Sequence, residues 1–396
     1  MKNTLKKLKP TKLFKDFFES EKSGGLTLIA CTAVSLIIAN SVWASNYEHF
    51  WHTDFAGHGI SHWINDGLMT IFFLLIGLEL EREIYQGELS NIKDALLPIF
   101  AAIGGMLLPA GLFLLLTYGT EGQAGIGIPM ATDIAFALGV LAILGQRVPL
   151  SLKIFVVAFA VIDDLGAIVL IALFYTAQVS VYYLVAALLV WALLLTLNRY
   201  FRVMSLLLYL IGGAVMWVLL LQSGIHATVT GVLLAFAIPF SSRSEDQSSP
   251  SHRLEHLLHK PAAFLILPIF ALANTGIVIA ANWADGLSSP NSLGVMVGLV
   301  AGKPAGIVLF CMAAVALGLC RLPEDLRWRH IAGAGMLGGI GFTMSIFITN
   351  LAFEGDADMI NGAKMAILLA SIIAGLLGFL WLRLATTLTP APTQQT

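Results

Sequence analysis

Long hydrophobic runs, separated by short polar connections, follow one another along almost the whole chain. A helix needs about 20 mostly apolar residues to cross the hydrocarbon core of a bilayer. The pattern therefore predicts about twelve membrane-spanning helices in an all-α fold. Their approximate ranges are 24–42, 60–80, 95–117, 125–144, 151–176, 181–198, 203–222, 224–240, 261–281, 292–320, 328–350 and 362–384.

Two of these runs are rich in glycine, at residues 119–129 and 333–343. They belong to the fourth and eleventh predicted spans, which run in opposite directions. We therefore expect spans 3–5 and 10–12 to form an inverted repeat, with an interrupted helix at the centre of each copy. Interrupted helices in inverted repeats indicate a transport site near the middle of the membrane.

Composition agrees with the hydrophobic pattern. Of the 396 residues, 58% are hydrophobic and 12% are charged, and the mean hydropathy is +0.85. Soluble proteins carry about 25% charged residues, so an integral membrane protein is indicated, with residues 1–396 as one transporter domain. The net charge of −2 argues neither for nor against an acidic partner, and no nucleic-acid partner is expected. The three cysteines lack the spacing of a zinc site. No cofactor is expected.

Lysine and arginine are segregated along the chain, and this sets the predicted orientation. Seven lysines lie in residues 1–22, which we interpret as a cytoplasmic segment before an uncleaved first span. If that end is inside, the connections on the same side hold Arg82, Lys93, Arg147, Arg199, Arg202, Arg243, Arg253, Lys260, Arg321, Arg327 and Arg329. The opposite connections hold mainly acids. Positive residues favour the cytoplasm, so both termini, including a tail at 385–396, are predicted inside.

Asp163 and Asp164 lie side by side in the apolar stretch Ile154–Tyr175. Carboxylates at membrane depth are costly and usually mark an ion or proton path. Neighbouring helical positions point about 100° apart, so the two cannot form a coplanar pair that shares one proton. They can face two sides of one cavity and hold either protons or a hard cation. Oxygen ligands suit Na⁺ or Li⁺.

The interrupted helices suggest roles for Asp133 and Lys303. A helix broken inside the membrane leaves partial charges at its new ends, which a carboxylate or an ammonium would neutralise. For Asp133 we favour this role over direct ion binding. For Lys303 the alternative is an ion pair with Asp163 that a cation releases, and the sequence does not separate the two roles.

Other ionisable residues have an ordinary and a functional interpretation. Asp66 and Glu79 lie near opposite ends of the second span. For each of them, an ordinary position at the membrane interface is as well supported as a functional role. His226 opens the eighth span, where packing or gating is favoured. The stretch 252–259 contains three histidines and is either a solvated helix start or a pH-responsive surface.

Four motifs occur in order along the chain: Ala131-Thr132-Asp133, Val161-Ile162-Asp163-Asp164, Lys303 and Gly338-Gly-Ile-Gly341-Phe-Thr343. Together they resemble the NhaA-type bacterial sodium/proton antiporters over essentially the whole chain. The resemblance implies crossed, unwound helices at spans four and eleven. It implies cation and proton binding at Asp163 and Asp164, with Thr132 and Asp133 close by.

The same resemblance implies a homodimer that forms partly through an external β-hairpin at about Asn46–His58, within the loop 43–59. The positions that match the pH-sensing region of the family are Glu79, Glu83, Glu255, His256 and His259. The expected function is an antiporter of the bacterial inner membrane that exports Na⁺ or Li⁺ for external H⁺ by alternating access. Uptake of two protons per Na⁺ would make the exchange electrogenic.

Three alternatives are weaker. A sodium-coupled solute symporter would need more polar groups near Asp163 than the aliphatic spans supply. An intramembrane aspartyl protease needs carboxylates that face each other from two helices. Adjacent residues cannot provide that geometry, although Asp133 with Asp163 could. A channel could also contain inverted broken helices, but a pair that exchanges protons for cations favours antiport over a channel or an enzyme.

Overall fold

The computed structural model describes residues 12–176, 179–241, 249–279 and 283–387. Its first half contains α1 (Lys12–Ala39), α2 (Ala44–His52), β1 (Asp54–Phe55), β2 (His58–Gly59), α3 (Ile60–His62), η1 (Trp63–Leu68), α4 (Met69–Tyr85), η2 (Glu88–Ser90), α5 (Ile92–Thr117), η3 (Glu121–Met130), α6 (Ile134–Leu144), η4 (Gly145–Arg147) and α7 (Leu150–Phe174). Its second half contains α8 (Val181–Arg199), α9 (Leu206–Ser223), α10 (Val229–Ala235), α11 (Pro250–Pro261), η5 (Ala262–Ile266), α12 (Leu267–Asn274), α13 (Trp283–Leu287), α14 (Pro290–Val297), η6 (Gly298–Gly302), α15 (Lys303–Ala316), α16 (Trp328–Gly338), α17 (Phe342–Ala352) and α18 (Ala357–Thr387).

The prediction of an all-α membrane protein is confirmed. In the described part of the chain, 9 helices are long and apolar enough to cross a membrane, or up to 11 if each bent pair forms one span. The predicted count of twelve is not confirmed. The run at 224–240 contains only α10, a helix of 7 residues, because the chain turns before and after it.

Both spans that contain the glycine-rich runs are interrupted, as predicted. In the first, η3 ends at Met130, Ala131 and Asp133 are extended, and α6 then begins. In the second, α16 and α17 meet at an angle of 45°. The backbone N–H of Asp133 donates to the carbonyl oxygen of Ile340 at 2.6 Å. The two interruptions, about two hundred residues apart in sequence, therefore contact each other.

The loop after α1 differs from the prediction. The β-hairpin expected at Asn46–His58 starts later, because the helix α2 occupies the first part of that segment. Only β1 and β2 pair, with two residues in each strand. The turn between them uses positive φ at Ala56 and Gly57, which is the backbone geometry of tight two-residue hairpins.

Helices α5 and α15 pack unusually closely, and this brings Lys303 into the interior. A Cβ placed on Gly306 would lie 2.0 Å from the carbonyl oxygen of Gly104. Only glycines let two membrane helices approach at this distance. Lys303 begins α15, three residues before Gly306, and its side chain is fully buried.

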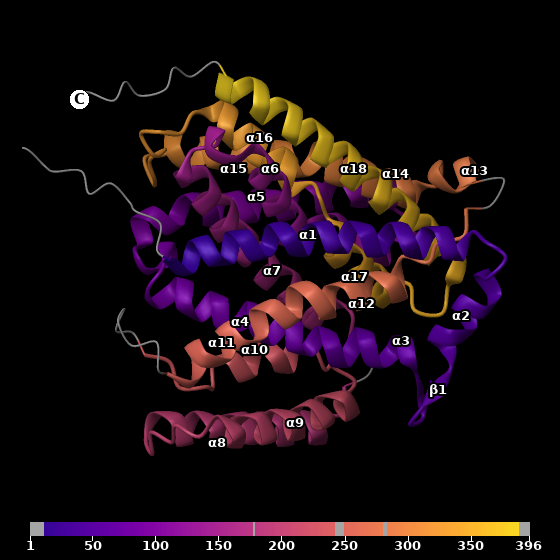
Figure 1. The fold of residues 1–396 in the computed structure, drawn as a ribbon, viewed down its shortest axis with the longest axis vertical. Coiled ribbons are helices and arrows are strands. Elements are labelled where there is room, and N and C mark those ends of the chain that lie inside the picture. Colours follow the sequence, from indigo (N-terminus) through magenta and orange to yellow (C-terminus); the bar gives the residue numbers. More distant parts are fainter. Residues whose placement is uncertain (1–11, 177–178, 242–248, 280–282, 388–396) are drawn as a thin grey trace, which may run out of the picture.

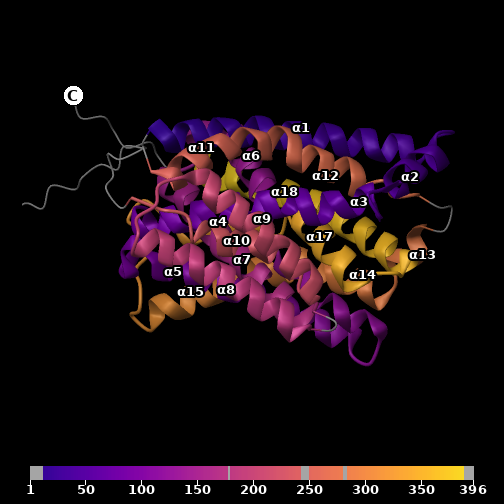
Figure 2. The same cartoon turned by 90° about the horizontal axis from the view of Figure 1, so that it is seen from below.

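Figures 1 and 2 show the helices lying roughly parallel, with the two ends of the bundle clearly different. The start of α1, the start of α11 and the end of α18 lie at one end, on the left in both views. The segment from α2 to β2 and the helix α13 lie at the other end. Helices α8 and α9 pack on each other along one edge. Residues 1–11, residues 242–248 and the part of the predicted tail from residue 388 onward lie outside the described residues.

Candidate functional site

Asp163 and Asp164 are buried in the middle of α7 and face different surroundings. The side chains are 0% and 1% exposed. Asp163 Oδ2 lies 2.7 Å from Lys303 Nζ on α15. Asp164 instead lines a cavity between α4, α6, α7, η5 and the start of α12. The two neighbouring carboxylates therefore have different partners, as expected for successive positions of a helix.

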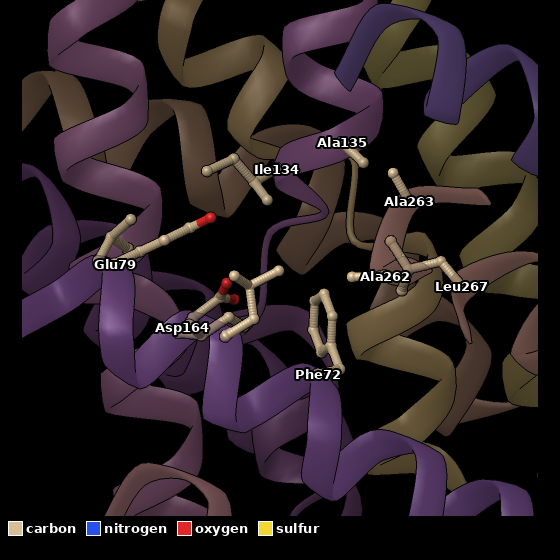
Figure 3. Close-up of a pocket in the computed structure, with 11 residues that line it drawn as sticks. Phe72, Glu79, Ile134, Ala135, Asp164, Ala262, Ala263 and Leu267 are labelled. Carbon is tan, nitrogen blue, oxygen red and sulfur yellow. The ribbon is translucent and has the colours of Figure 1, made fainter. Parts of the chain in front are cut away.

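The cavity extends from Asp164 to Glu79, which lies on the last half of α4 (Figure 3). The remaining lining side chains are apolar: Phe72, Leu75, Ile76, Ile134, Ala135, Val161, Ala262, Ala263 and Leu267. Asp164 and Glu79 are thus the two acids that this apolar space joins. Within the described residues, the Oδ1 atoms of Asp163 and Asp164 have no hydrogen-bond donor.

Lys303 combines the two roles that the sequence left open. Its ammonium group donates to the carbonyl oxygen of Met130 and pairs with Asp163. Met130 is the last residue of η3, so this carbonyl is at the negative end of an interrupted helix. The Lys303 ammonium group therefore neutralises a helix end and pairs with a carboxylate of the site at the same time.

Asp133 holds the starts of two half-helices. Its Oδ1 accepts from the backbone N–H of Phe136 at 3.0 Å, at the start of α6. Its Oδ2 accepts from the backbone N–H of Thr343 at 3.1 Å and from the Thr343 hydroxyl at 2.5 Å, at the start of α17. A carboxylate is stabilised at this position because helix N-termini carry partial positive charge. These contacts agree with the capping role that we predicted for Asp133.

Other small polar side chains join the interruptions, and most of them carry little signal in the sequence. Thr132 donates its hydroxyl to the carbonyl oxygen of Gly338 at 2.9 Å. Ser345 donates to the carbonyl oxygen of Ile128 at 2.6 Å, and Ser371 accepts from the backbone N–H of Phe342. Serine is common in membrane helices as a packing residue, so the signal for Ser345 and Ser371 was weak.

At the other end of the cavity, most of the predicted pH-sensing residues come together. Glu79 lies 3.6 Å from His259 Nδ1, and Arg82 bridges Glu83 and Glu255, each at 2.8 Å. Arg82, which we had not selected, is the centre of this network. His256 is exposed on α11 and makes none of these ion pairs.

Asp66 and His226 belong to a different region. Asp66 in η1 pairs with His62 Nδ1 at 3.2 Å. His226 contacts the carbonyl oxygen of Tyr175 at 2.9 Å. Tyr175 follows α7 and donates its hydroxyl to the carbonyl oxygen of Ala124 at 2.8 Å. These contacts lie near the end of the bundle that carries the hairpin.

Residues 15–382 match the family described as Na+/H+ antiporter 1. The chain belongs to this family. Both interrupted helices, the buried aspartates and Lys303 fall within the matched residues of the Na+/H+ antiporter 1 family. The resemblance seen in the motifs is therefore confirmed, and the chain is a multi-pass membrane protein of a transporter family.

Individual relatives within the Na+/H+ antiporter 1 family are similar over nearly their whole length. A protein of Dechloromonas aromatica named Na(+)/H(+) antiporter NhaA is 65% identical over 94% of this chain and 96% of its own length. One of Flavobacterium johnsoniae, named Na(+)/H(+) antiporter NhaA 1, is 60% identical over 96% of this chain and 99% of its own. One of Shewanella loihica is 46% identical over 94% and 97%.

Proposed function

We propose that this protein exchanges cytoplasmic Na⁺ or Li⁺ for external H⁺, with Asp163 and Asp164 binding the cation and the protons in turn. The observation that carries the proposal is the buried pair itself, in which both Oδ1 atoms lack a donor. An uncompensated carboxylate at this depth is costly. A proton or a small hard cation would remove that cost, and both cannot occupy the same oxygens.

The cavity supports access from the Glu79 end. A cation would pass Glu79, lose its water and reach Asp164 first, because Asp164 lines the cavity and Asp163 is held by Lys303. Binding to both carboxylates then requires Lys303 to release Asp163. Protons that arrive from the other side reverse these steps, and the Lys303–Asp163 pair forms again.

The interrupted helices support a site that moves between two faces. Spans 3–5 and 10–12 would form the inverted repeat, with the interruptions at Asp133 and Ile340 crossing at its centre. Because their half-helix ends are joined by side chains and not by continuous helix, they can shift while Asp133 and Lys303 keep those ends neutral. Alternating access would follow from movement of one group of helices against the other.

The orientation and assembly are part of the same proposal. The protein would lie in the bacterial inner membrane with the start of α1 and the end of α18 in the cytoplasm. The segment from β1 to β2 would be external and would contribute to a homodimer. The cluster of Glu79, Glu83, Glu255 and His259 would face the cytoplasm, where histidine protonation near neutral pH can change its charge and regulate entry.

A solute symporter is less well supported than exchange. Apart from Asp164 and Glu79, the cavity lining in the described residues is apolar. An organic solute with several polar groups would lose its hydrogen bonds with water there and find few partners.

Inside-out vesicles that carry a pH gradient test the proposal directly. Added Na⁺ or Li⁺ should collapse the gradient in vesicles that contain the natural protein. Asp163→Asn and Asp164→Asn should each abolish this response, because an amide keeps the size of the side chain but cannot bind and release a proton. Glu121→Gln, at an exposed position outside the cavity, is the matched control and should leave the response intact.

Detection of each variant in the membrane at normal levels shows that it has folded. If both aspartate variants still release protons on addition of Na⁺, the proposed mechanism is wrong.

A further inference from the structure

The end of the site away from Glu79 is closed by two layers of side chains, and the same three segments supply both. The first layer, which we call the aromatic plug, consists of Phe73 of α4, Phe270 of α12 and Phe347 of α17. The ring centroids of Phe73 and Phe347 lie 5.6 Å apart, and those of Phe270 and Phe347 lie 6.3 Å apart. All three side chains are at most 1% exposed.

The second layer, which we call the amide clasp, consists of Asn65 of η1, Asn274 of α12 and Asn350 of α17. Asn274 Nδ2 donates to Asn65 Oδ1 at 2.9 Å. Asn350 Nδ2 donates to Asn274 Oδ1 at 2.6 Å. Asn274 is 4% exposed and bonds to both of the others, so it joins three elements that are far apart in sequence.

Chain direction places the clasp beyond the plug on every element. Helix α4 runs from the hairpin end towards Glu79, so Asn65 lies nearer the hairpin end than Phe73. Helices α12 and α17 run the opposite way, so Asn274 and Asn350, each about one turn after its phenylalanine, also lie nearer that end. The cavity lies mainly on the other side, since Leu75, Ile76 and Glu79 of its lining follow Phe73 on α4 and Leu267 precedes Phe270 on α12.

We propose that the aromatic plug and the amide clasp together are the external gate of this transporter, closed in the present conformation. This inference rests on the proposed function, in which the hairpin end is external. The plug excludes water and ions from Asp164. The clasp holds the three segments together around the plug, and outward release of the cation requires both layers to separate.

The chemistry of the two layers suits a reversible closure. Hydrogen bonds between membrane helices are weak, so each one shifts an equilibrium by about threefold and the two bonds of Asn274 by about tenfold. When the clasp opens, water from outside can replace the lost amide partners. Two of the gate segments adjoin π-helical stretches, η1 and η5, a geometry that occurs frequently at functional sites.

Thiol labelling from each side of the membrane tests the gate. The background carries alanine in place of Cys31, Cys311 and Cys320, all free cysteines, and Ile134→Cys places a reporter in the cavity wall. A membrane-impermeant maleimide is added to right-side-out or to inside-out vesicles. With the gate intact, we expect the reporter to react readily in inside-out vesicles and slowly in right-side-out vesicles.

Asn274→Leu keeps the side-chain volume but removes both bonds of the clasp, and it should raise the external labelling rate about tenfold. Phe347→Leu should also raise that rate, because it opens the plug. Asn198→Leu is the matched control: this amide of α8 bonds to the carbonyl oxygen of Ala237 and lies on none of the gate segments. Labelling in inside-out vesicles should stay unchanged in all three variants, which also shows that they fold.

If Asn274→Leu is labelled from outside at the parent rate, the amide clasp is not part of the gate. The same result for Phe347→Leu would show that the aromatic plug is not part of it. If the parent is labelled preferentially from outside, the assumed orientation is wrong and the proposed external gate is wrong as well. None of these measurements involves Na⁺ transport. Failure of the proposed exchange would appear separately, in the Asp163→Asn and Asp164→Asn vesicles.

Discussion

At the residue scale, Lys303 is the cation around which the buried charges are arranged. It is fully buried and contacts both the carbonyl end of η3 and Asp163. Removal of one partner from a buried ion pair costs about 3–5 kcal/mol, because an uncompensated charge remains in the interior. Loss of either partner would therefore destabilise the protein when no cation is bound, and in the proposed exchange the Lys303–Asp163 pair opens when a cation binds.

We expect Lys303→Met to lower the free energy of unfolding by about 3–5 kcal/mol in Na⁺-free buffer. The double variant Lys303→Met with Asp163→Asn should be more stable than Lys303→Met alone, because it no longer buries an unpaired carboxylate. Thermal unfolding of the purified proteins in detergent measures both. Lys260→Met, at an exposed lysine, is the control. Equal losses in the single and the double variant would show that the pair is not coupled.

Asp133 accepts hydrogen bonds at two helix starts and does not line the cavity. Its substitution should therefore affect stability more than exchange. Asp133→Ala leaves buried N–H groups without acceptors, which costs about 1–3 kcal/mol for each group. Asp133→Asn retains one acceptor oxygen and should lose less stability. Na⁺-driven proton release should persist in Asp133→Asn while it disappears in Asp164→Asn. Complete loss of exchange in both variants would instead assign Asp133 to the ion site.

At the element scale, the close approach of α5 and α15 places Lys303 next to Asp163. A Cβ on Gly306 would overlap the carbonyl oxygen of Gly104, which is backbone and cannot move away on its own. Gly306→Ala should therefore separate the helices, destabilise the protein by more than about 2 kcal/mol, and reduce exchange by displacing Lys303. Unfolding midpoints and Na⁺-dependent proton release measure the two effects.

Gly111→Ala provides the control for this prediction. Gly111 lies on the same helix α5, but a Cβ there meets nothing within 4 Å. Alanine is a better helix former than glycine by up to about 1 kcal/mol, so this variant should be neutral or slightly stabilised. If Gly306→Ala and Gly111→Ala behave alike, contact between α5 and α15 does not position Lys303.

Some features of these elements could be predicted from the sequence, and others could not. The buried aspartates and both interruptions could be predicted, because charge at membrane depth and clustered glycines are local signals. The length of α10 and the helix α2 could not, since turns at the ends of a short apolar run leave little trace in its composition. The exposure of His256 also depends on how α11 is rotated against α4, which a helical spacing alone does not determine.

Contacts between distant segments were the least predictable part of the site. Ser345 meets Ile128, and Lys303 meets Met130, only because the two interruptions lie against each other. Asn65, Asn274 and Asn350 lie on three separate elements, and a single asparagine in an apolar run is a common packing residue. The sequence therefore indicated which residues carry charge inside the membrane, but not which of them share a partner.

At the scale of the whole molecule, the proposed mechanism has the site reached from one end of the bundle and closed at the other. One net charge moved through a potential of 100 mV corresponds to about 2.3 kcal/mol. If two protons enter for each Na⁺ that leaves, one net charge crosses the membrane in every cycle. The Na⁺ gradient at which net exchange stops must then depend on the membrane potential as well as on the pH difference.

Proteoliposomes with the potential clamped by K⁺ and valinomycin test this dependence. At a fixed pH difference, about 60 mV should change the Na⁺ ratio at which net exchange stops by about tenfold, because that potential supplies about 1.4 kcal/mol per net charge. Asp164→Asn liposomes, which should show no exchange, control for leakage. One-for-one exchange moves no net charge, so an unchanged null point would exclude uptake of two protons. In that case the bound cation would replace a proton on only one of the two carboxylates.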